Sequence, residues 1–282
     1  MPIGFIGGSG IYEALDLANE SEHAVSTPFG DPAAPVTVGI LDGTEIAFLP
    51  RHGRDHGFSP TNTPYRANLH ALKSLGCERV LSSNAVGSLR ADLPPRSLVV
   101  PDQLFDRTRS RPYTFFDEGI VVHIAFGQPY CPHVVDHLAE AAGEVGVDCE
   151  RGGTYVCIEG PQFSTVSESE FYRDQGFDIV GMTAVPEAKL AREAELCYAT
   201  VAGVTDFDVW KAGSEVTQEE VVENATANEA NIKEVVERAI ETMPAERECD
   251  CGSALDGAVA TDPTSVDEAT RERYSALLGE YL

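Results

Sequence analysis

The segment from Arg51 to His56 is dense in groups that bind anions and move protons. Arg51 carries a planar guanidinium whose N–H donors suit a phosphate, and we expect His52 to act as a second donor. The whole chain carries a net charge of −26, so an anion has to be captured by local positive charge, which makes this basic cluster informative. The alternative is that Arg51 and Arg54 pair with nearby carboxylates such as Asp55.

Two carboxyl groups, Asp206 and Asp208, follow the apolar stretch from Cys197 to Val204. In extended backbone, residues on either side of Phe207 point to opposite faces, so only one of the two need face a ligand. A carboxyl group in an apolar pocket has a raised pKa and can donate a proton. The alternative is that one or both residues cap the segment that follows.

Further polar residues stand where predicted strands end. Residues 3–11 predict a strand and a glycine-rich turn whose N–H groups can point at an anion, and Ser9 adds a hydroxyl. The backbone of Asn84 and Ala85, which open a predicted loop through residue 88, could complete this cradle. Met182 offers a soft surface to a sugar or base, although most methionines belong to the core.

The elements that must position these residues alternate between strands and helices. Pro64 is expected as the first residue of a helix that stops at Gly76. Strands are predicted at 46–49, 79–83, 98–101, 154–158, 177–180 and 197–204, with a hairpin-like pair within 27–49. Further helices are predicted at 133–145, 167–175, 186–195 and from a Thr217–Glu220 capping box to about 243. The pattern predicts an α/β fold with helices on both faces of a sheet, and ligands beyond the carboxyl ends of its strands.

Composition favours one catalytic domain with an appended segment. The apolar share of 43% supports a sizeable core. The sharpest change falls near Pro244, which divides the chain into residues 1–244 and a C-terminal extension, residues 245–282. The extension contains Cys249-x-Cys251 and a last helix that we expect Ser265 and Glu268 to cap.

Charge and hydropathy exclude several classes of protein. The strongly acidic chain repels nucleic acid and anionic membranes, and no apolar run is long enough to span a bilayer. The N-terminus shows no basic segment followed by a long apolar one, so a cytoplasmic protein is expected. The seven cysteines form neither a disulfide framework nor a zinc-like spacing, and Cys77, Cys157 and Cys197 are expected in the core. No metal site is therefore predicted.

The ordered motifs of the chain resemble those of one family, the purine nucleoside phosphorylases, in its methylthioadenosine phosphorylase branch. The similarity covers residues 3 to about 243 and is carried by IGGSG (6–10), RHGRDH (51–56), PYRAN (64–68), NAVGSL (84–89), PDQ (101–103), IEGPQFST (158–165), GMTAVPEAKLAREAELCYA (181–199) and TDFDVW (205–210). The resemblance implies a three-layer α/β fold around a central mixed sheet, usually assembled as homotrimers or homohexamers.

The implied reaction is phosphorolysis of a purine nucleoside, with phosphate as co-substrate and no metal or organic cofactor. The resemblance places phosphate contacts on Ser9, Arg51, His52, Asn84 and Ala85. It places nucleoside contacts on Met182, Thr183, Phe163, Ser164, Asp206 and Asp208, and one of the two aspartates protonates purine N7. His123 resembles a residue that reaches the pocket of a neighbouring subunit. The Cys249-x-Cys251 pair resembles a pair that forms a disulfide in some archaeal members, and free thiols are the alternative.

The identity of the base is left open between two substrate groups. Asp206 and Asp208 suit a 6-amino base, as in S-methyl-5′-thioadenosine, because a carboxylate accepts from the exocyclic amine. Archaeal relatives with similar motifs prefer 6-oxopurine nucleosides such as methylthioinosine, inosine or guanosine. Asn84 stands where many members have Thr, and Ser164 and Gln218 are candidate specificity residues.

Two other classes of protein are weighed against this one. A nicotinamide-dependent oxidoreductase would explain a glycine loop after the first strand, but the spacing of Gly4, Gly7, Gly8 and Gly10 is not G-x-G-x-x-G. A non-catalytic nucleoside-binding protein would keep the base contacts and would not need Arg51 and His52.

The excess of acidic residues predicts a protein of the haloarchaeal type, adapted to high internal salt. Its 20 basic residues include 16 Arg and only four Lys. Because salt screens repulsion within a few ångströms, we expect the melting temperature to rise between dilute buffer and molar potassium chloride. A melting temperature that does not change with salt would indicate a merely acidic protein.

Overall fold

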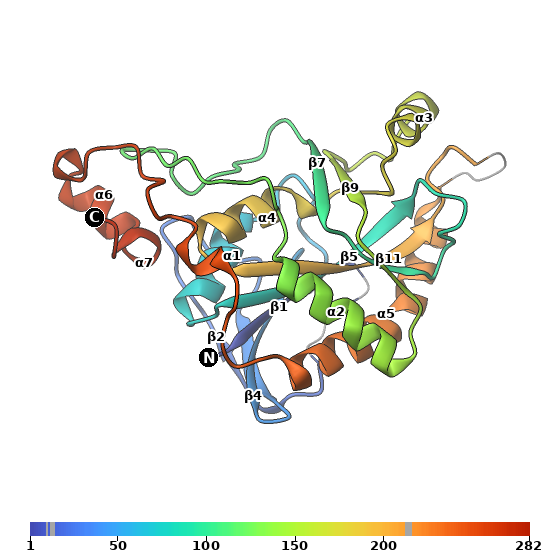
Figure 1. Ribbon diagram of the computed structural model, residues 1–282, viewed down its shortest axis with the longest axis horizontal. Helices are drawn as coiled ribbons and strands as arrows, with labels where there is room; N and C mark the ends of the chain where they lie inside the picture. The colour runs from blue at the N-terminus through green and yellow to red at the C-terminus, as the bar shows by residue number, and fades with distance from the viewer. Residues whose placement is uncertain (10, 12–14, 212–215) are drawn as a thin grey trace.

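The computed structural model describes residues 1–9, 11, 15–211 and 216–282, and one long strand, β5 (Arg79–Ser88), lies at the centre of its sheet (Figure 1). Ten further strands join it in a mixed sheet, namely β1 (Ile3–Gly7), β2 (Ala18–His23), β3 (Val36–Leu41), β4 (Thr44–Pro50), β6 (Leu98–Val100), β7 (Gln103–Arg107), β8 (Cys149–Arg151), β9 (Thr154–Ile158), β10 (Ile179–Gly181) and β11 (Cys197–Asp206).

β5 has different partners along its two halves. On one side, its first residues pair in parallel with β1 as far as Ser82, and its last residues, Gly87 and Ser88, pair antiparallel with β10. On the other side, β11 follows it in parallel over nearly its whole length. Between Ser82 and Gly87 the β1 and β10 side is therefore open, because β1 has ended and β10 has not begun.

Helices cover the sheet in two groups. α2 (Pro132–Val145) and the long α5 (Gln218–Thr242) pack on each other and on β11, as Figure 1 shows. α1 (Tyr65–Ser74) and α4 (Ala184–Glu193) form the second group, and α3 (Val166–Asp174) stands apart at one end of the molecule. The predicted α/β architecture, a mixed sheet with helices, is confirmed. Among the described helices, none combines the length and apolarity needed to cross a membrane.

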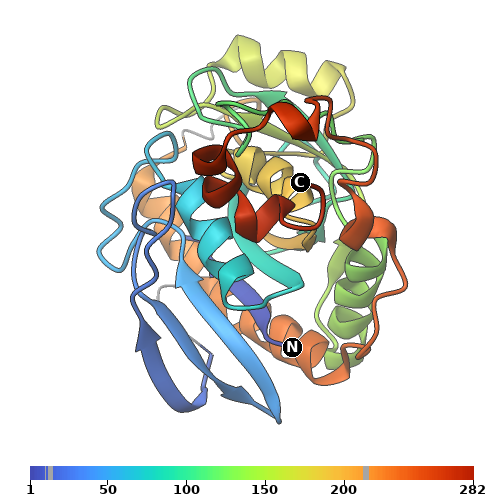
Figure 2. The same cartoon turned by 90° about the vertical axis from the view of Figure 1, so that its left-hand side faces the viewer.

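The C-terminal residues return to the second group of helices. Two short 3-10 turns, η1 (Asp250–Ser253) and η2 (Pro263–Ser265), lead to α6 (Glu268–Arg273) and α7 (Ser275–Leu278). Leu255, Tyr274 and Leu278 are buried in the same apolar core as the strands. Figure 2 shows this segment lying over α1 and α4. The extension is thus packed on the body through apolar side chains.

Several expected boundaries were wrong, for identifiable reasons. Residues 84–88 are strand and not loop, because β11 pairs with residues 84–87 and β10 pairs with Gly87 and Ser88. The short strands β2, β7 and β8 were not predicted, and β2 is exposed along its length, so it lacks an apolar alternation. Pro64 precedes its helix, and Asp267 caps α6 by accepting from the Thr270 N–H, where Ser265 had been expected. Gly10 of the expected turn lies outside the described residues.

Candidate functional site

A cavity of about 490 Å³ opens where β5 loses its partner. The carboxyl ends of β5, β10 and β11 and the first turns of α5 surround it. All predicted site residues except His123 line it, namely Ser9, Arg51, His52, Asn84, Ala85, Phe163, Ser164, Met182, Thr183, Asp206, Asp208 and Gln218. The fold therefore brings together segments that lie up to about 200 residues apart in the sequence, as expected for the strand ends of an α/β sheet.

Arg51 enters the cavity wall as a buried ion pair. Its Nε and Nη2 each lie 2.7 Å from a carboxylate oxygen of Glu187, which is fully buried in α4. Nη1 donates to the Ser83 carbonyl at 2.8 Å, and Nη2 also donates to Ser82. Burial opposes the charged form, yet the Glu187 carboxylate raises the pKa of Arg51 above its ordinary value. Arg51 does pair with a carboxylate, as the alternative held, but the partner is Glu187 and not Asp55.

Gly8 lets the Arg51 guanidinium approach the first strand. A Cβ at this position would lie 2.3 Å from the Ser83 carbonyl oxygen and 2.7 Å from Arg51 Nη1, so any side chain would displace one of them. The Gly8 N–H donates to Ser83 Oγ at 2.9 Å. The expected role of this turn is thus partly structural: glycine is required for close packing around Arg51, with Ser9 next to it at the cavity wall.

His52 is a neutral group in this site. Its Nδ1 lies 2.9 Å from the Phe58 carbonyl, which can only accept, so the ring proton is on Nδ1 and Nε2 is an acceptor. Burial, with Arg51 next in effect, lowers the pKa of His52 to about 3. The ring stacks on His56 at a centroid distance of 4.5 Å. The predicted contact of His52 with an anion stays a prediction, and in this tautomer Nε2 would accept a hydrogen bond from a hydroxyl of that anion.

Asn84 is held in a polar network between two strands. Its Nδ2 donates to Thr183 Oγ1 at 2.5 Å, and its Oδ1 accepts from the Thr200 hydroxyl of β11. This network places Thr183 beside β5, where both residues line the cavity. Asn84 thus presents its edge to the cavity from a strand and not from the predicted loop.

Asp206 and Asp208 both face the cavity. Asp208 has a positive φ of 50°, so the backbone is not extended, and the expected alternation of the two side chains does not occur. Asp206 is fully engaged: Oδ1 accepts from the Asp208 N–H and Oδ2 from the Thr205 hydroxyl, each at 2.7 Å. Among the described residues, the buried oxygen Asp208 Oδ2 has no hydrogen-bond partner, and neither has Ser164 Oγ.

Burial raises the pKa of both carboxyl groups above their ordinary value. For Asp208, the Ser169 and Ser164 hydroxyls lie close enough to lower the pKa in part, without forming an aligned hydrogen bond, and the charge of Asp206 raises it further. A carboxyl with a raised pKa and an unpaired oxygen is suited to donate a proton to a ligand. Asp208 fits this role better than Asp206, whose oxygens are both occupied.

Arg111 organises the loops at the cavity rim, and sequence reasoning missed it. This buried guanidinium donates to the carbonyls of Met182 at 2.6 Å and of Val185 and Glu159 at 2.5 Å. It thereby clamps the segment after β9 to the segment after β10. The available signal was three arginines within residues 107–111 of a chain that has few basic residues.

Glu187 and the inner face of α5 were also missed. Glu187 stands between apolar residues in the first turn of α4, a pattern that indicates a buried partner. Val221, Val222 and Ala225 form an apolar wall of the cavity. His123 is exposed, lies outside the cavity within one chain and donates its N–H to the Ala258 carbonyl. Its predicted role toward a neighbouring subunit stays a prediction.

Comparison with known proteins gives a consistent family. The model of the phosphorylase superfamily matches residues 2–241. S-methyl-5′-thioadenosine phosphorylase of Koribacter versatilis is 49% identical over 99% of this chain and 96% of its own. The crystal structure of a methylthioadenosine phosphorylase from an antarctic soil metagenomic library has a TM-score of 0.93 and 42% identity, covering 98% of both chains.

A third comparison concerns a variant enzyme. The adenosine/methylthioadenosine phosphorylase of Schistosoma mansoni, solved with adenine, has a TM-score of 0.86 and 34% identity over 92% of this chain and 99% of its own. In that variant a serine and an asparagine are each replaced by threonine. The two replaced positions have the same separation along the chain as Ser9 and Asn84 here.

The buried Arg51–Glu187 pair generates a stability prediction. Replacing Glu187 with Ala leaves the Arg51 charge buried and uncompensated, so we expect a loss of about 3–5 kcal/mol in the free energy of unfolding. Urea denaturation at constant salt measures it. Glu229→Ala, which removes a helical ion pair with Lys233 near the surface, is the control and should cost roughly 0.5 kcal/mol. Equal losses in the two variants would contradict the prediction.

Proposed function

Because the chain belongs to the phosphorylase superfamily and, within it, to the methylthioadenosine phosphorylases, we propose that it converts S-methyl-5′-thioadenosine and phosphate into adenine and 5-methylthioribose 1-phosphate. The observation that carries this proposal is one cavity that holds a candidate anion cradle, at Ser9, Arg51 and Asn84, together with the unpaired buried carboxyl of Asp208.

The phosphate is expected at the open edge of β5. Four of the five Arg51 N–H groups are used within the described residues, which leaves one on Nη1 for an anion. The Ser9 hydroxyl can donate as well. His52 Nε2, an acceptor, suits the hydroxyl of a hydrogen phosphate. An oxygen of the phosphate attacks the anomeric carbon of the ribose, and its negative charge stabilises the oxocarbenium-like transition state.

The purine is expected against Asp208. As the bond between the anomeric carbon and N9 breaks, its electron pair passes to the purine ring, and the Asp208 carboxyl donates a proton to N7. A protonated carboxyl offers one donor and one acceptor, which match N7 and the 6-amino group of adenine. The methylthioribosyl group is transferred to phosphate and adenine is released, so the reaction balances without a metal or organic cofactor. The apolar wall of Met182, Val221 and Val222 suits the purine ring and a methylthio group.

Adenosine is a second candidate substrate. The Schistosoma mansoni enzyme is named for both adenosine and methylthioadenosine, and its replaced serine and asparagine correspond in separation to Ser9 and Asn84. Ser9 and Asn84 present smaller or differently shaped surfaces to the phosphate and sugar than threonine would. This correspondence supports a site that also accepts a 5′-hydroxyl.

Assembly and location extend the proposal. A homotrimer or homohexamer in the cytoplasm would place the exposed His123 of one subunit near the cavity of a neighbour. The N–H of His123 is tied to Ala258 of the extension, which fixes its backbone. Light scattering in molar salt would give the molar mass, and a monomer would leave His123 without this role.

The direct test is base release in molar salt. We expect rapid, phosphate-dependent release of adenine from methylthioadenosine, and slower release of hypoxanthine or guanine from methylthioinosine, inosine and guanosine. Adenosine is assayed in parallel, and phosphate-dependent release of adenine from it would show that it is also a substrate. Release of 6-oxo bases alone would move the protein to the 6-oxopurine group. Tight nucleoside binding without any phosphate-dependent product would overturn the enzymatic proposal.

Asp208→Asn separates base recognition from proton donation. We expect kcat to fall about 10²-fold or more, since the proton donor is lost. The ratio of kcat/KM for methylthioadenosine over methylthioinosine should fall at least about tenfold, because an amide donates to O6 and N7. Asp174→Asn, on the exposed end of α3, is the control. An unchanged ratio would show that Asp208 does not read the base.

The pH profile of Asp206→Asn tests the coupling of the two carboxyls. Activity requires protonated Asp208, so kcat declines as pH rises through its raised pKa. Asp206 raises that pKa by its charge, and its removal should therefore move the decline to lower pH. The ratio of kcat/KM for methylthioadenosine over methylthioinosine should stay as in the wild type. A decline that moves to higher pH would contradict the assignment.

A further inference from the structure

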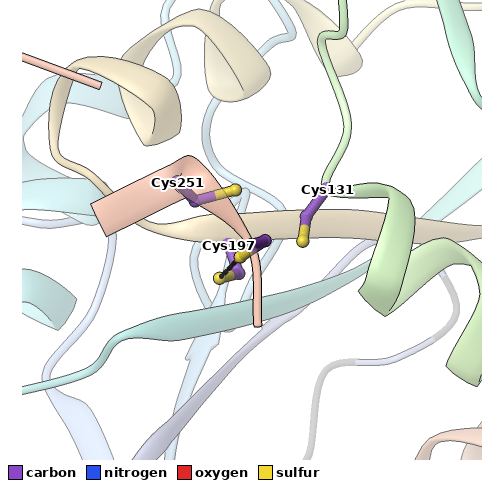
Figure 3. A group of neighbouring side chains, drawn as sticks. Cys131, Cys197 and Cys251 are labelled. Carbon is purple, nitrogen blue, oxygen red and sulfur yellow. Dashed lines mark hydrogen bonds between the residues drawn. The ribbon is translucent and has the colours of Figure 1, made fainter. Parts of the chain in front are cut away.

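Four cysteine thiols meet near the first residue of β11, whereas the nucleoside cavity lies at its last residues. They come from three separate segments: Cys131 precedes α2, Cys197 begins β11, and in the extension Cys249 precedes the turn η1, which contains Cys251. Their four Sγ atoms all lie within 4.8 Å of one another. Figure 3 shows the side chains of Cys131, Cys197 and Cys251 pointing toward a common centre.

We propose that these four cysteines bind one structural Zn²⁺ ion as a tetrathiolate site. Zinc prefers four thiolates in a tetrahedron with Zn–S distances near 2.3 Å, which sets the sulfur atoms about 3.8 Å apart. The observed separations surround this value, since Cys197 and Cys249 are at 3.3 Å and none exceeds 4.8 Å. Small rotations of the side chains would complete the tetrahedron. All four cysteines are free thiols in the structure, so each has a ligand atom to offer.

The backbone that carries the thiols is already held in place. The Cys131 N–H donates to the Tyr198 carbonyl at 2.8 Å, and the Cys197 N–H donates to the Glu78 carbonyl at 2.9 Å. On the extension side, Arg79 donates to the Glu246 carbonyl at 2.8 Å. A site whose ligands are fixed before binding loses little chain entropy when the metal arrives.

Cationic groups near the sulfur atoms would compensate their charge. Four thiolates and one Zn²⁺ carry a net charge of −2, which is costly on a chain that is already strongly acidic. Arg192 Nη1 lies 3.5 Å from Cys251 Sγ and donates to it, while Nη2 donates to the Gln128 carbonyl. Such hydrogen bonds to ligand sulfur atoms are typical of the surroundings of metal sites.

A small cavity provides access to the cluster. It measures about 240 Å³ and is lined by Cys131, Cys197 and Cys249 together with Arg79, His133 and Arg247. A hydrated ion could reach three of the four ligands through it. The type of ligand, the number of ligands and the access path therefore all meet the requirements of a zinc site.

The zinc site departs from the expectation that the cysteines bind no metal, since their sequence separations are unlike those of zinc-binding motifs. Cys197 is buried in the apolar core, as expected, and its thiol also belongs to the cluster. The three remaining cysteines lie outside the cluster: Cys77 and Cys157 are buried elsewhere in the core, and Cys149 lies on β8. A metal at the cluster would join α2, β11 and the extension, and would stabilise the folded chain by mass action.

Metal analysis of untagged protein tests the proposal. The protein is produced in zinc-supplemented medium, dialysed in molar salt and analysed by inductively coupled plasma mass spectrometry. We expect about one zinc per chain. Cobalt substitution should give the visible absorption of a tetrahedral thiolate complex. The double variant Cys249→Ser with Cys251→Ser should lose the zinc and melt at least about 5 °C lower, whereas the matched control Cys149→Ser should keep both properties.

Two results would overturn the proposal. One is folded protein without zinc in which all seven thiols react after unfolding. The other is the presence of disulfides among the cluster cysteines. The intact mass measured without reductant would then be lower by the hydrogen atoms lost from the thiols, and these cysteines would resist alkylation. If the double variant does not fold, cobalt absorption and zinc content of the wild-type chain still decide. None of these measurements depends on nucleoside turnover, so the outcome is independent of the proposed activity.

Discussion

The shared pairing of β5 is the constraint on which the rest of the structure depends. A strand normally has one neighbour on each side, but β5 exchanges β1 for β10 partway along, and residues 83–86 are left without a strand on that side. Backbone groups exposed in this way need partners. Arg51 supplies one by donating to the Ser83 carbonyl. The cavity is thus a gap in the sheet that side chains line without filling.

The site achieves anion and base chemistry with little net charge. The buried Arg51 guanidinium is balanced by Glu187, His52 is neutral, and the raised pKa of Asp208 favours its protonated form. A preorganised set of dipoles in a water-poor cavity stabilises developing charge more strongly than the same groups in water. For a chain with a net charge of −26, such local neutrality also keeps a phosphate from facing an uncompensated carboxylate near its site.

Local signals predicted most of the architecture, and long-range pairings account for what was missed. Prolines and glycines bounded α1 and α2 to within one or two residues, and apolar runs located β9 and β11. The strand character of residues 84–88 depends on pairing with β10 and β11, which follow much later in the sequence, and no local pattern encodes it. Every predicted site residue except His123 lines the cavity. Glu187 escaped notice because its partner Arg51 lies 136 residues earlier, and the four cysteines converge only once α2, β11 and the extension have packed.

The left-handed backbone at Asp208 has a consequence for how this site can diverge. A φ of 50° strains most side chains, and Asp and Asn, whose short polar groups bond locally, adopt it far more readily than branched residues. The backbone therefore limits the amino acids that can arise at the position that we propose to face the base. An exchange between Asp and Asn needs a single nucleotide change in the codon and no rearrangement of the main chain. If Asp208 reads the base as proposed, a change between 6-amino and 6-oxo purines is a short evolutionary step on this scaffold.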